Sequence, residues 1–267
     1  MEKLSLLLFS NSEFLILLCF TFVILIIGYF LYQLYYFKSE KHRSILSLVL
    51  MMLIYTVISF WKLGSTSFPT TTWQPTAEKQ QITFDFGKSE KFDAIYTIYG
   101  EGDTNSNPST YQIGTNNIHL YASNDLQEWT RIASLKQGNI YTYAIEQGNW
   151  QYRYVKLVDL SENSSLSEIG FRNEDHTGFL PISILRDKQK DGPYPGSLLI
   201  DEQDKLVISP TYYDQAYFDE IYHVRNAWEI ANGQYMYANV HPLLGTNIIA
   251  LSIRLFGMNP FAWRLPG

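Results

Sequence analysis

The stretch QITFDFG, residues 81–87, decides the fold of the middle of the chain, because its apolar and polar residues alternate. Such alternation is typical of a β-strand with one buried face. Similar β-branched and aromatic stretches follow as FDAIYTIYG (92–100), NIHLYAS (117–123) and YRYVKLVDL (152–160). Turn signals such as GEGDTNSNPS and QGN separate them, as in proteins built from many short strands. We therefore expect an all-β sandwich over residues 81–175.

Two apolar stretches without a charged residue precede this region, at residues 14–37 and 44–61. A helix rises about 1.5 Å per residue, so the first stretch can cross the ~30 Å hydrocarbon core of a bilayer, and the second is at the short end. The loop between them, KSEKHR (38–43), is rich in Lys and Arg. Such loops stay cytoplasmic, which predicts that the β region lies outside. A buried helical hairpin in a soluble protein is the alternative.

These features divide the chain into five parts. We expect two transmembrane helices over 1–62, a linker over 63–80, the β-sandwich over 81–175, a second linker over 176–215, and a helix with the start of further transmembrane helices over 216–267. The last part stops at Gly267 inside what should be another helix, so we expect an N-terminal part of a larger protein. The predicted location is the plasma membrane, with the β-sandwich and the last part on the extracytoplasmic side.

The composition argues against several classes of protein and site. The net charge is −6 and no dense run of Lys and Arg occurs, so nucleic acid is not expected as a partner. The single cysteine, Cys19, excludes an intramolecular disulfide and a cysteine metal site. The sequence contains no HExxH spacing and no Gly-rich phosphate loop, so we expect neither a metal site nor a cofactor.

The middle region carries four short motifs in a characteristic order. They are Phe84-Asp-Phe-Gly87, Tyr121 to Asp125 followed by Trp129, Tyr152 to Leu157, and Leu166 to Ile169. This order resembles the discoidin, or coagulation factor 5/8 type C, family of jelly-roll sandwiches. The resemblance implies that loops at one end bind a glycan or a lipid surface. A sugar could stack on an exposed Trp or Tyr, and packing of these aromatic residues in the core is the alternative.

A second informative stretch is YFDEIYHVRNAWEIANG, residues 217–233. Its apolar residues recur at near-helical spacing and Gly233 is a plausible stop, so the stretch predicts an amphipathic helix that could lie along a membrane surface. Two carboxylates, Asp219 and Glu220, stand at its start. Capping of the helix by Asp219, with Glu220 favoured by the helix dipole, is the simplest interpretation of this pair.

Together with HPLLGTNIIALSIRLFGMNPFAWRLPG (241–267), this stretch resembles the N-terminal signature of the protein O-mannosyltransferases, which are membrane glycosyltransferases of the GT-C superfamily. The resemblance implies that Asp219 is the general base for an acceptor Ser or Thr hydroxyl, and that Glu220 positions the acceptor or the base. The implied donor is mannose, or a related hexose, on a polyprenyl phosphate, transferred with inversion. Leu243 and Thr246 replace a usual proline and lysine, which leaves the donor and full activity open.

Three further residues are candidates for substrate binding. His241 belongs to the HPLLG motif, and His223 and Arg225 lie about one helical turn from the acidic pair. A local salt bridge with Asp219 or Glu220 is the alternative for His223 and Arg225. A structural role at the start of an apolar helix is the alternative for His241.

The expected function is therefore sugar transfer at the outer face of the membrane. The expected partners are membrane lipid, the lipid-linked donor, a secreted or membrane protein as acceptor, and a glycan on the β-sandwich. Two other functions stay open. One is a membrane-anchored glycan-binding protein that acts through the β-sandwich, and the other is a lipid-linked sugar transferase with a non-protein acceptor.

Overall fold

The computed structural model describes residues 12–36, 40–100, 112–113, 118–135, 138–160, 165–236, 238 and 241–267. The chain divides into two compact units, Met1–Leu63 and Gly64–Gly267. The first unit is helical, and the second contains the β-strands and the C-terminal helices.

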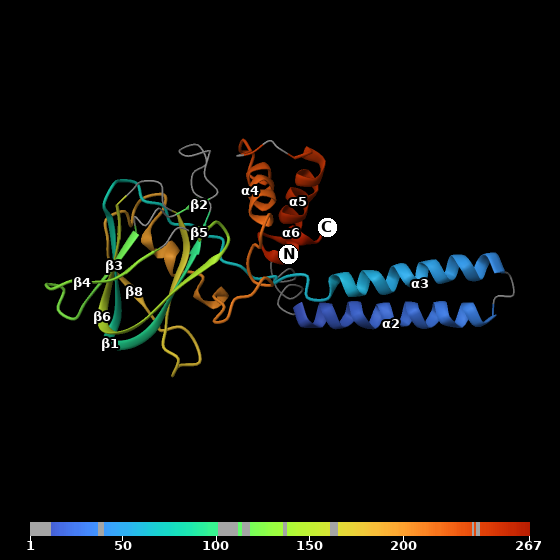
Figure 1. Ribbon diagram of the computed structural model, residues 1–267, viewed down its shortest axis with the longest axis horizontal. Helices are drawn as coiled ribbons and strands as arrows, with labels where there is room; N and C mark the ends of the chain where they lie inside the picture. Colours follow the sequence, from blue (N-terminus) through green and yellow to red (C-terminus); the bar gives the residue numbers. More distant parts are fainter. Residues whose placement is uncertain are drawn as a thin grey trace. The chain divides into compact units, whose positions relative to one another are not determined.

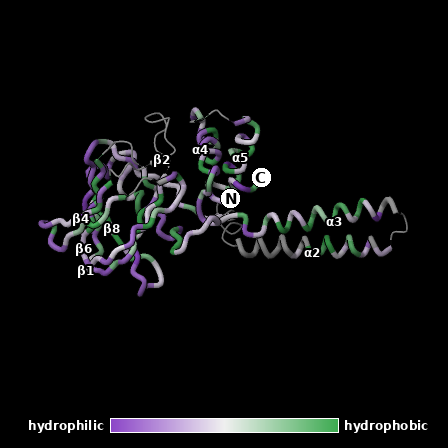
Figure 2. Tube along the Cα trace, in the orientation of Figure 1, coloured by the Kyte–Doolittle hydropathy of each residue, from purple (hydrophilic) through white to green (hydrophobic). Residues whose placement is uncertain are grey.

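The first unit is an antiparallel pair of helices, α2 (Ser12–Tyr36) and α3 (Glu40–Phe60) (Figure 1). Apolar residues line most of α3 (Figure 2), and its segment Arg43–Phe60 is long and apolar enough to cross a membrane. None of that segment is buried, which argues against the alternative of a hairpin inside a soluble core. Among the described residues of α2, the apolar segment is shorter, Ile24–Gln33. Membrane insertion of this pair stays a prediction. Of the predicted basic loop 38–43, residues 40–43 belong to α3, and residues 38 and 39 lie outside the described residues.

The second unit is built around one antiparallel sheet with the strand order β4-β3-β6-β1-β7, and β8 also pairs with β1. A separate two-stranded sheet pairs β2 with β5. The strands are β1 (Gln80–Tyr99), β2 (Gln112–Ile113), β3 (Ile118–Ser123), β4 (Thr130–Ser134), β5 (Gly138–Asn139), β6 (Tyr143–Asp159), β7 (Leu166–Arg172) and β8 (Ser183–Asp187).

The long strands β1 and β6 bend and fold this sheet into two layers (Figure 1). The bend lies where the β1–β6 register shifts between Asp85 and Glu90, and Gly87 adopts a φ of 80° there. Before the bend, β1 pairs with the end of β6 and with β8, and β3 and β4 extend this five-stranded layer. After the bend, β1 pairs with the start of β6 and with β7, which makes a three-stranded layer.

Aromatic side chains fill the space between the two layers. Phe84 and Phe86 of the five-stranded layer contact Phe171 of β7, with ring centroids 6.1 and 5.1 Å apart. Ile82, which is on the same face as Phe84, is fully buried, as the alternation in residues 81–87 predicts. The predicted all-β sandwich is therefore confirmed, as an antiparallel one.

The sandwich extends beyond the predicted limits of 81 and 175. Within the predicted linker 63–80, Trp73 is fully buried and exchanges backbone hydrogen bonds of 2.8 and 3.1 Å with Leu166. Within the predicted linker 176–215, β8 joins the sheet, and the short 3-10 helices η1 (Gly196–Leu199) and η2 (Gln203–Lys205) follow. These stretches are not free linkers. Their polar, Pro-containing sequence hides the fold because long-range contacts, not periodicity, hold them.

The C-terminal part forms α4 (Glu220–Ala231), α5 (Leu243–Phe256) and α6 (Pro260–Arg264). Gly233, with a φ of 71°, follows the end of α4 as the sequence predicts. Aromatic contacts join these helices to the sandwich, because the Trp263 ring lies 5.8 Å from Phe68 and 6.3 Å from Tyr141. With 14 residues, α5 spans about 21 Å, less than a bilayer core, so its insertion in a membrane stays a prediction.

Candidate functional site

Glu220, at the start of α4, is fixed by the end of the chain. Its two carboxylate oxygens accept hydrogen bonds from Nε and Nη2 of Arg264, each 2.7 Å long, in a two-pronged ion pair. Nε1 of Trp263 lies 3.4 Å from Oε2, and the backbone N–H of Tyr217 donates to the same oxygen at 3.0 Å. The sequence stretches FDE and NPFAWR, 44 residues apart, therefore meet at this carboxylate.

Asp219 is the opposite case. It occupies the N-cap position of α4, but its backbone is helical (φ −73°, ψ −9°) and its side chain makes no capping hydrogen bond. Its carboxylate is exposed, and within the described part of the chain it has no hydrogen bond or ion pair. The capping interpretation of Asp219 is therefore wrong, because an N-cap side chain reaches the helix N–H groups from an extended backbone.

The residue before this carboxylate is strained. Phe218 has a φ of 51° and its side chain is 77% exposed. A bulky residue in the left-handed region is uncommon and unfavourable, and such residues cluster at functional sites. The geometry thus presents two exposed side chains, Phe218 and Asp219, beside a fixed one, Glu220.

The three other candidate residues separate into two groups. His223 and His241 lie together, with ring centroids 4.7 Å apart, although His223 is on α4 and His241 lies two residues before α5. Arg225 instead pairs with Glu229, one turn further along α4, at 3.1 Å, and both side chains are buried. The alternative of a salt bridge from Arg225 to the acidic pair is therefore wrong, and the i, i+4 spacing on the helix explains the partner it does have.

One member of the histidine pair, His223, stands near the acidic pair in the sequence. His223 lies four residues after Asp219, which places both on one face of the helix start. Among the described residues, no group of three His, Cys, Asp or Glu side chains is arranged to hold a metal ion. The two departures from the family motif differ in environment, because Thr246 is buried and Leu243 is 48% exposed.

A second candidate site lies on the outer face of the five-stranded layer. Nζ of Lys156, on β6, lies 4.0 Å from the ring centroid of Trp129 and 5.7 Å from that of Tyr121. Tyr121 is the cross-strand neighbour of Lys156, and Trp129 stands directly before β4. All three side chains are partly exposed, and partial burial lowers the pKa of Lys156. We name this group the Lys156 platform.

The turn that carries Trp129 is tightly hydrogen-bonded. Oδ1 of Asp125 accepts from the backbone N–H groups of Gln127 and Glu128 at 2.9 and 3.0 Å, and these bonds hold the pKa of Asp125 below its usual value. Nε1 of Trp129 donates to the carbonyl of Leu126 at 3.3 Å. The ring is thus held in place before any ligand arrives.

Some aromatic residues of the sandwich pack in the core, and others have partly exposed rings on which a sugar could stack. Trp73, Tyr99, Phe84 and Phe171 are fully buried and belong to the core. Trp129, with Tyr121, faces outward. Sequence reasoning placed Trp129 and Lys156 among the family motifs but missed their contact, because only the strand register brings them together.

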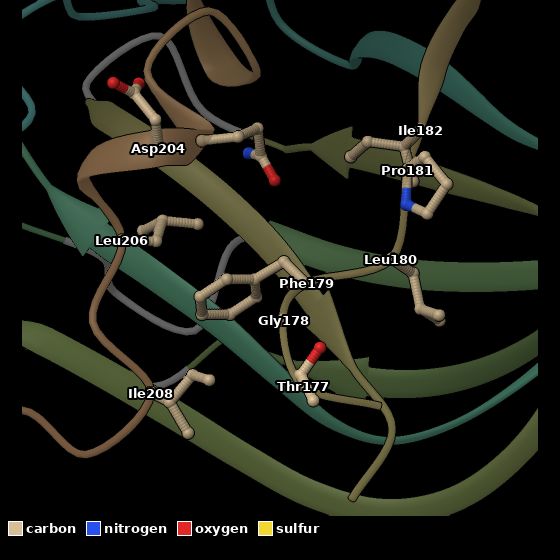
Figure 3. Close-up of a pocket in the computed structure, with 10 residues that line it drawn as sticks. Thr177, Gly178, Phe179, Leu180, Pro181, Ile182, Asp204, Leu206 and Ile208 are labelled. Atoms are coloured by element: carbon tan, nitrogen blue, oxygen red, sulfur yellow. The ribbon is translucent and has the colours of Figure 1, made fainter. Parts of the chain in front are cut away.

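A third candidate site is a hollow on the outer face of the three-stranded layer (Figure 3). It has a volume of about 470 Å³, and apolar side chains such as Phe179, Leu206 and Ile208 line it. Its amide side chain, Gln203, already donates to Glu168 and to the carbonyl of Ile169. The polar side chains that remain for a ligand at the hollow are Thr177 and Asp204, to which the structure gives no side-chain hydrogen bond among the described residues.

No family model matches the sequence, and no curated protein matches it. Similar solved structures include CpGH89CBM32-6 of Clostridium perfringens, which is 22% identical and is aligned over 42% of this chain and 82% of its own, with a TM-score of 0.32. A pectin-binding carbohydrate-binding module is 15% identical over 43% of this chain and 80% of its own, with a TM-score of 0.30. CpGH89CBM32-5 of the same bacterium, in complex with GalNAc-β-1,3-galactose, is 18% identical over 39% and 77%, with a TM-score of 0.30. None of these findings tests sugar transfer, so the O-mannosyltransferase resemblance stays a prediction.

Proposed function

We propose that this chain is a membrane-anchored glycan-binding protein whose β-sandwich holds sugars at the Lys156 platform. The observation that carries the proposal is the 4.0 Å contact between Nζ of Lys156 and the partly exposed ring of Trp129. Trp and Tyr combine an apolar ring with a polar tip, which suits the faces and hydroxyls of a pyranose. The ammonium adds three hydrogen-bond donors beside the rings.

The position of the platform favours binding over a structural role. An ammonium loses free energy when it is withdrawn from water without an acidic partner, so a core would not normally contain one. In the part of the chain that the structure describes, Lys156 has no ion pair. The α2–α3 pair, with its apolar segment Arg43–Phe60, would keep this platform close to a membrane.

The direct test uses the full chain in detergent and a set of neutral and acidic oligosaccharides on a glycan array. Trp129→Ala should weaken binding about tenfold, since a lost aromatic contact removes on the order of 1 kcal/mol. Trp129→Phe should retain most of the affinity. Tyr212→Ala removes another exposed aromatic ring, outside the sheet, and should leave binding unchanged. Equal binding by Trp129→Ala and the unmodified chain would exclude the platform as the site.

We also propose sugar transfer as a second function, at the start of α4. The observation that favours it is the contrast between Asp219, which is exposed beside a strained Phe218, and Glu220, which Arg264 fixes. An unpaired carboxylate can take the proton of an acceptor hydroxyl while the hydroxyl oxygen bonds to the anomeric carbon. As this bond forms, the bond from that carbon to the phosphate oxygen of a polyprenyl-phosphate mannose, or related hexose, breaks on the opposite side, and the phosphate leaves as an anion. The acceptor would be a protein Ser or Thr, with a non-protein hydroxyl as the alternative.

This second function is tested in membranes that contain the whole protein, with a radiolabelled polyprenyl-phosphate hexose as donor. Asp219→Asn should lower the transfer rate at least 100-fold, because a general base contributes about 10²- to 10⁴-fold. Asp204→Asn changes an exposed carboxylate far along the chain from the helix start and serves as the control. Transfer that survives Asp219→Asn would sink the assignment of the base.

A further inference from the structure

A row of side chains crosses the outer face of the five-stranded layer from edge to edge. Arg186 on β8 pairs with Thr83 on β1, and Thr83 pairs with Lys156 on β6. Lys156 pairs with Tyr121 on β3, and Tyr121 pairs with Arg131 on β4. Directly paired residues present their side chains on the same face of a sheet. Thr83 faces away from the core because its neighbours in β1 are core residues, so the whole row faces outward.

The cations in this row are regularly spaced. They stand on alternate strands, β8, β6 and β4, and neighbouring strands are about 4.8 Å apart, so the backbone positions of successive cations are separated by about 10 Å. The positions between them hold Thr83, which is 5% exposed, and the partly exposed ring of Tyr121. We name Arg186, Lys156 and Arg131 the cation row.

The described residues place no acidic side chain against the cation row. Ion pairs elsewhere join Arg153 to Asp85, Lys88 to Glu90 and Lys205 to Glu202, but in the described residues no carboxylate lies within ion-pair distance of the row. Nη2 of Arg131 donates to the hydroxyl of Ser134, which is uncharged. The sequence as a whole carries a net charge of −6, so this face reverses the sign of the chain. An anionic ligand is the complementary partner.

We propose that the cation row binds an acidic polysaccharide in which a carboxylate-bearing sugar alternates with a neutral one. The proposal rests on the proposed glycan binding at the Lys156 platform, and it names the class of glycan. Carboxylates would pair with the two guanidinium groups and the ammonium, and the neutral sugar between them would meet Tyr121 or Trp129.

The shape of the face favours a polysaccharide over a lipid surface. The row runs across the five strands of a sheet, and the two rings beside it, those of Tyr121 and Trp129, are partly buried. Binding to a bilayer surface instead relies on apolar side chains that insert among the headgroups. An extended chain of sugars can lie along the row and contact all three cations together.

The test compares three probes on the full chain in detergent. They are a hyaluronan octasaccharide, its carboxyl-reduced neutral form, and a water-soluble short-chain phosphatidylserine without glycan. The octasaccharide should bind at least tenfold more tightly than its reduced form, and added salt should shrink this preference. Lys156→Gln and Arg186→Gln should each reduce the preference several-fold, and Lys91→Gln, an exposed lysine on the other half of β1, should not.

The outcomes separate this proposal from the one it rests on. Equal binding of the acidic and the reduced octasaccharide would overturn the acidic specificity and leave glycan binding at the platform intact. If neither octasaccharide binds and no glycan on the array binds, both the acidic specificity and the glycan binding at the Lys156 platform are overturned. Binding of the short-chain phosphatidylserine alone, lost in Lys156→Gln, would replace the polysaccharide with a lipid headgroup.

Discussion

The two outer faces of the sandwich have opposite surroundings, although β1 contributes to both. On the three-stranded layer, Tyr96, Ile98 and Glu168 point outward from the sheet, yet each is at most 4% exposed because the segment 196–208 and its neighbours cover them. On the five-stranded layer, Arg131 and Arg186 are exposed and Lys156 is partly exposed. One sheet thus has a covered face, which acts as a second core, and a more open face, on which the cations are exposed or partly exposed although Thr83 between two of them is 5% exposed.

Backbone contact explains how the covered face is closed. A Cβ atom at Gly170 would lie 2.5 Å from Cδ1 of Leu206 and 2.7 Å from Cδ1 of Phe179, so these side chains rest directly on the strand. The hydroxyl of Tyr96 donates to the carbonyl of Ile208 at 2.7 Å. Glu202 in turn accepts the backbone N–H of Thr71 at 3.0 Å, which ties the cover to the stretch before β1.

The largest effect should come from the interior that both layers share. Phe171→Ala removes a fully buried ring that contacts Phe84 and Phe86, and it should lower the free energy of unfolding by about 3–5 kcal/mol. Tyr121→Ala on the open face should lower it by about 1 kcal/mol or less, as is usual for surface substitutions. Thermal unfolding of the full chain in detergent, followed by near-ultraviolet circular dichroism, measures both. An equal loss for the two variants would mean that the open face is covered as well.

The sequence predicts those parts of the fold in which a strand or helix has a regular spacing of apolar residues. Alternation in residues 81–87 places Ile82, Phe84 and Phe86 in the core, and helical spacing predicts α4. Trp73 and β8 escape prediction because their partners, Leu166 and β1, lie far away in the sequence and the segments themselves have no periodic pattern. The cover over the three-stranded layer was hidden for the same reason.

The candidate sites follow the same rule. The sequence indicates that Asp219 and Glu220 matter, but it cannot identify Arg264 as the partner of Glu220 across 44 residues. It also gives no sign that Asp219 has a helical backbone, which is why capping fails as an explanation. The cation row needs the register of five strands, since no two of its members are close in the sequence.

A smaller effect should come from Glu168 on the covered face, as a dependence of the free energy of unfolding on pH. Oε2 of Glu168 accepts the N–H of Glu202 at 3.1 Å and Oε1 accepts Nε2 of Gln203, but burial dominates and raises the pKa of Glu168 to about 8, against 4.5 for a free glutamate. Between these values the folded chain holds a proton that the unfolded chain has released. The contribution of Glu168 to the free energy of unfolding is therefore fully present below about pH 4.5. It falls as the pH rises toward 8, by up to about 1.4 kcal/mol per pH unit.

Glu168→Gln stays neutral at every pH, so its stability relative to the unmodified chain should rise between pH 5 and pH 8. We expect a relative gain on the order of 2 kcal/mol. This gain is smaller than the pKa difference alone implies, because water that reaches the charged carboxylate restores part of its solvation free energy. Denaturation midpoints of the two chains at several pH values measure the gain. Glu128→Gln, a carboxyl exposed beside the open face, provides the matched control. If both substitutions gave the same pH profile, Glu168 would be in contact with water, and the contrast between a covered and an open face would fail at the residue that defines it most sharply.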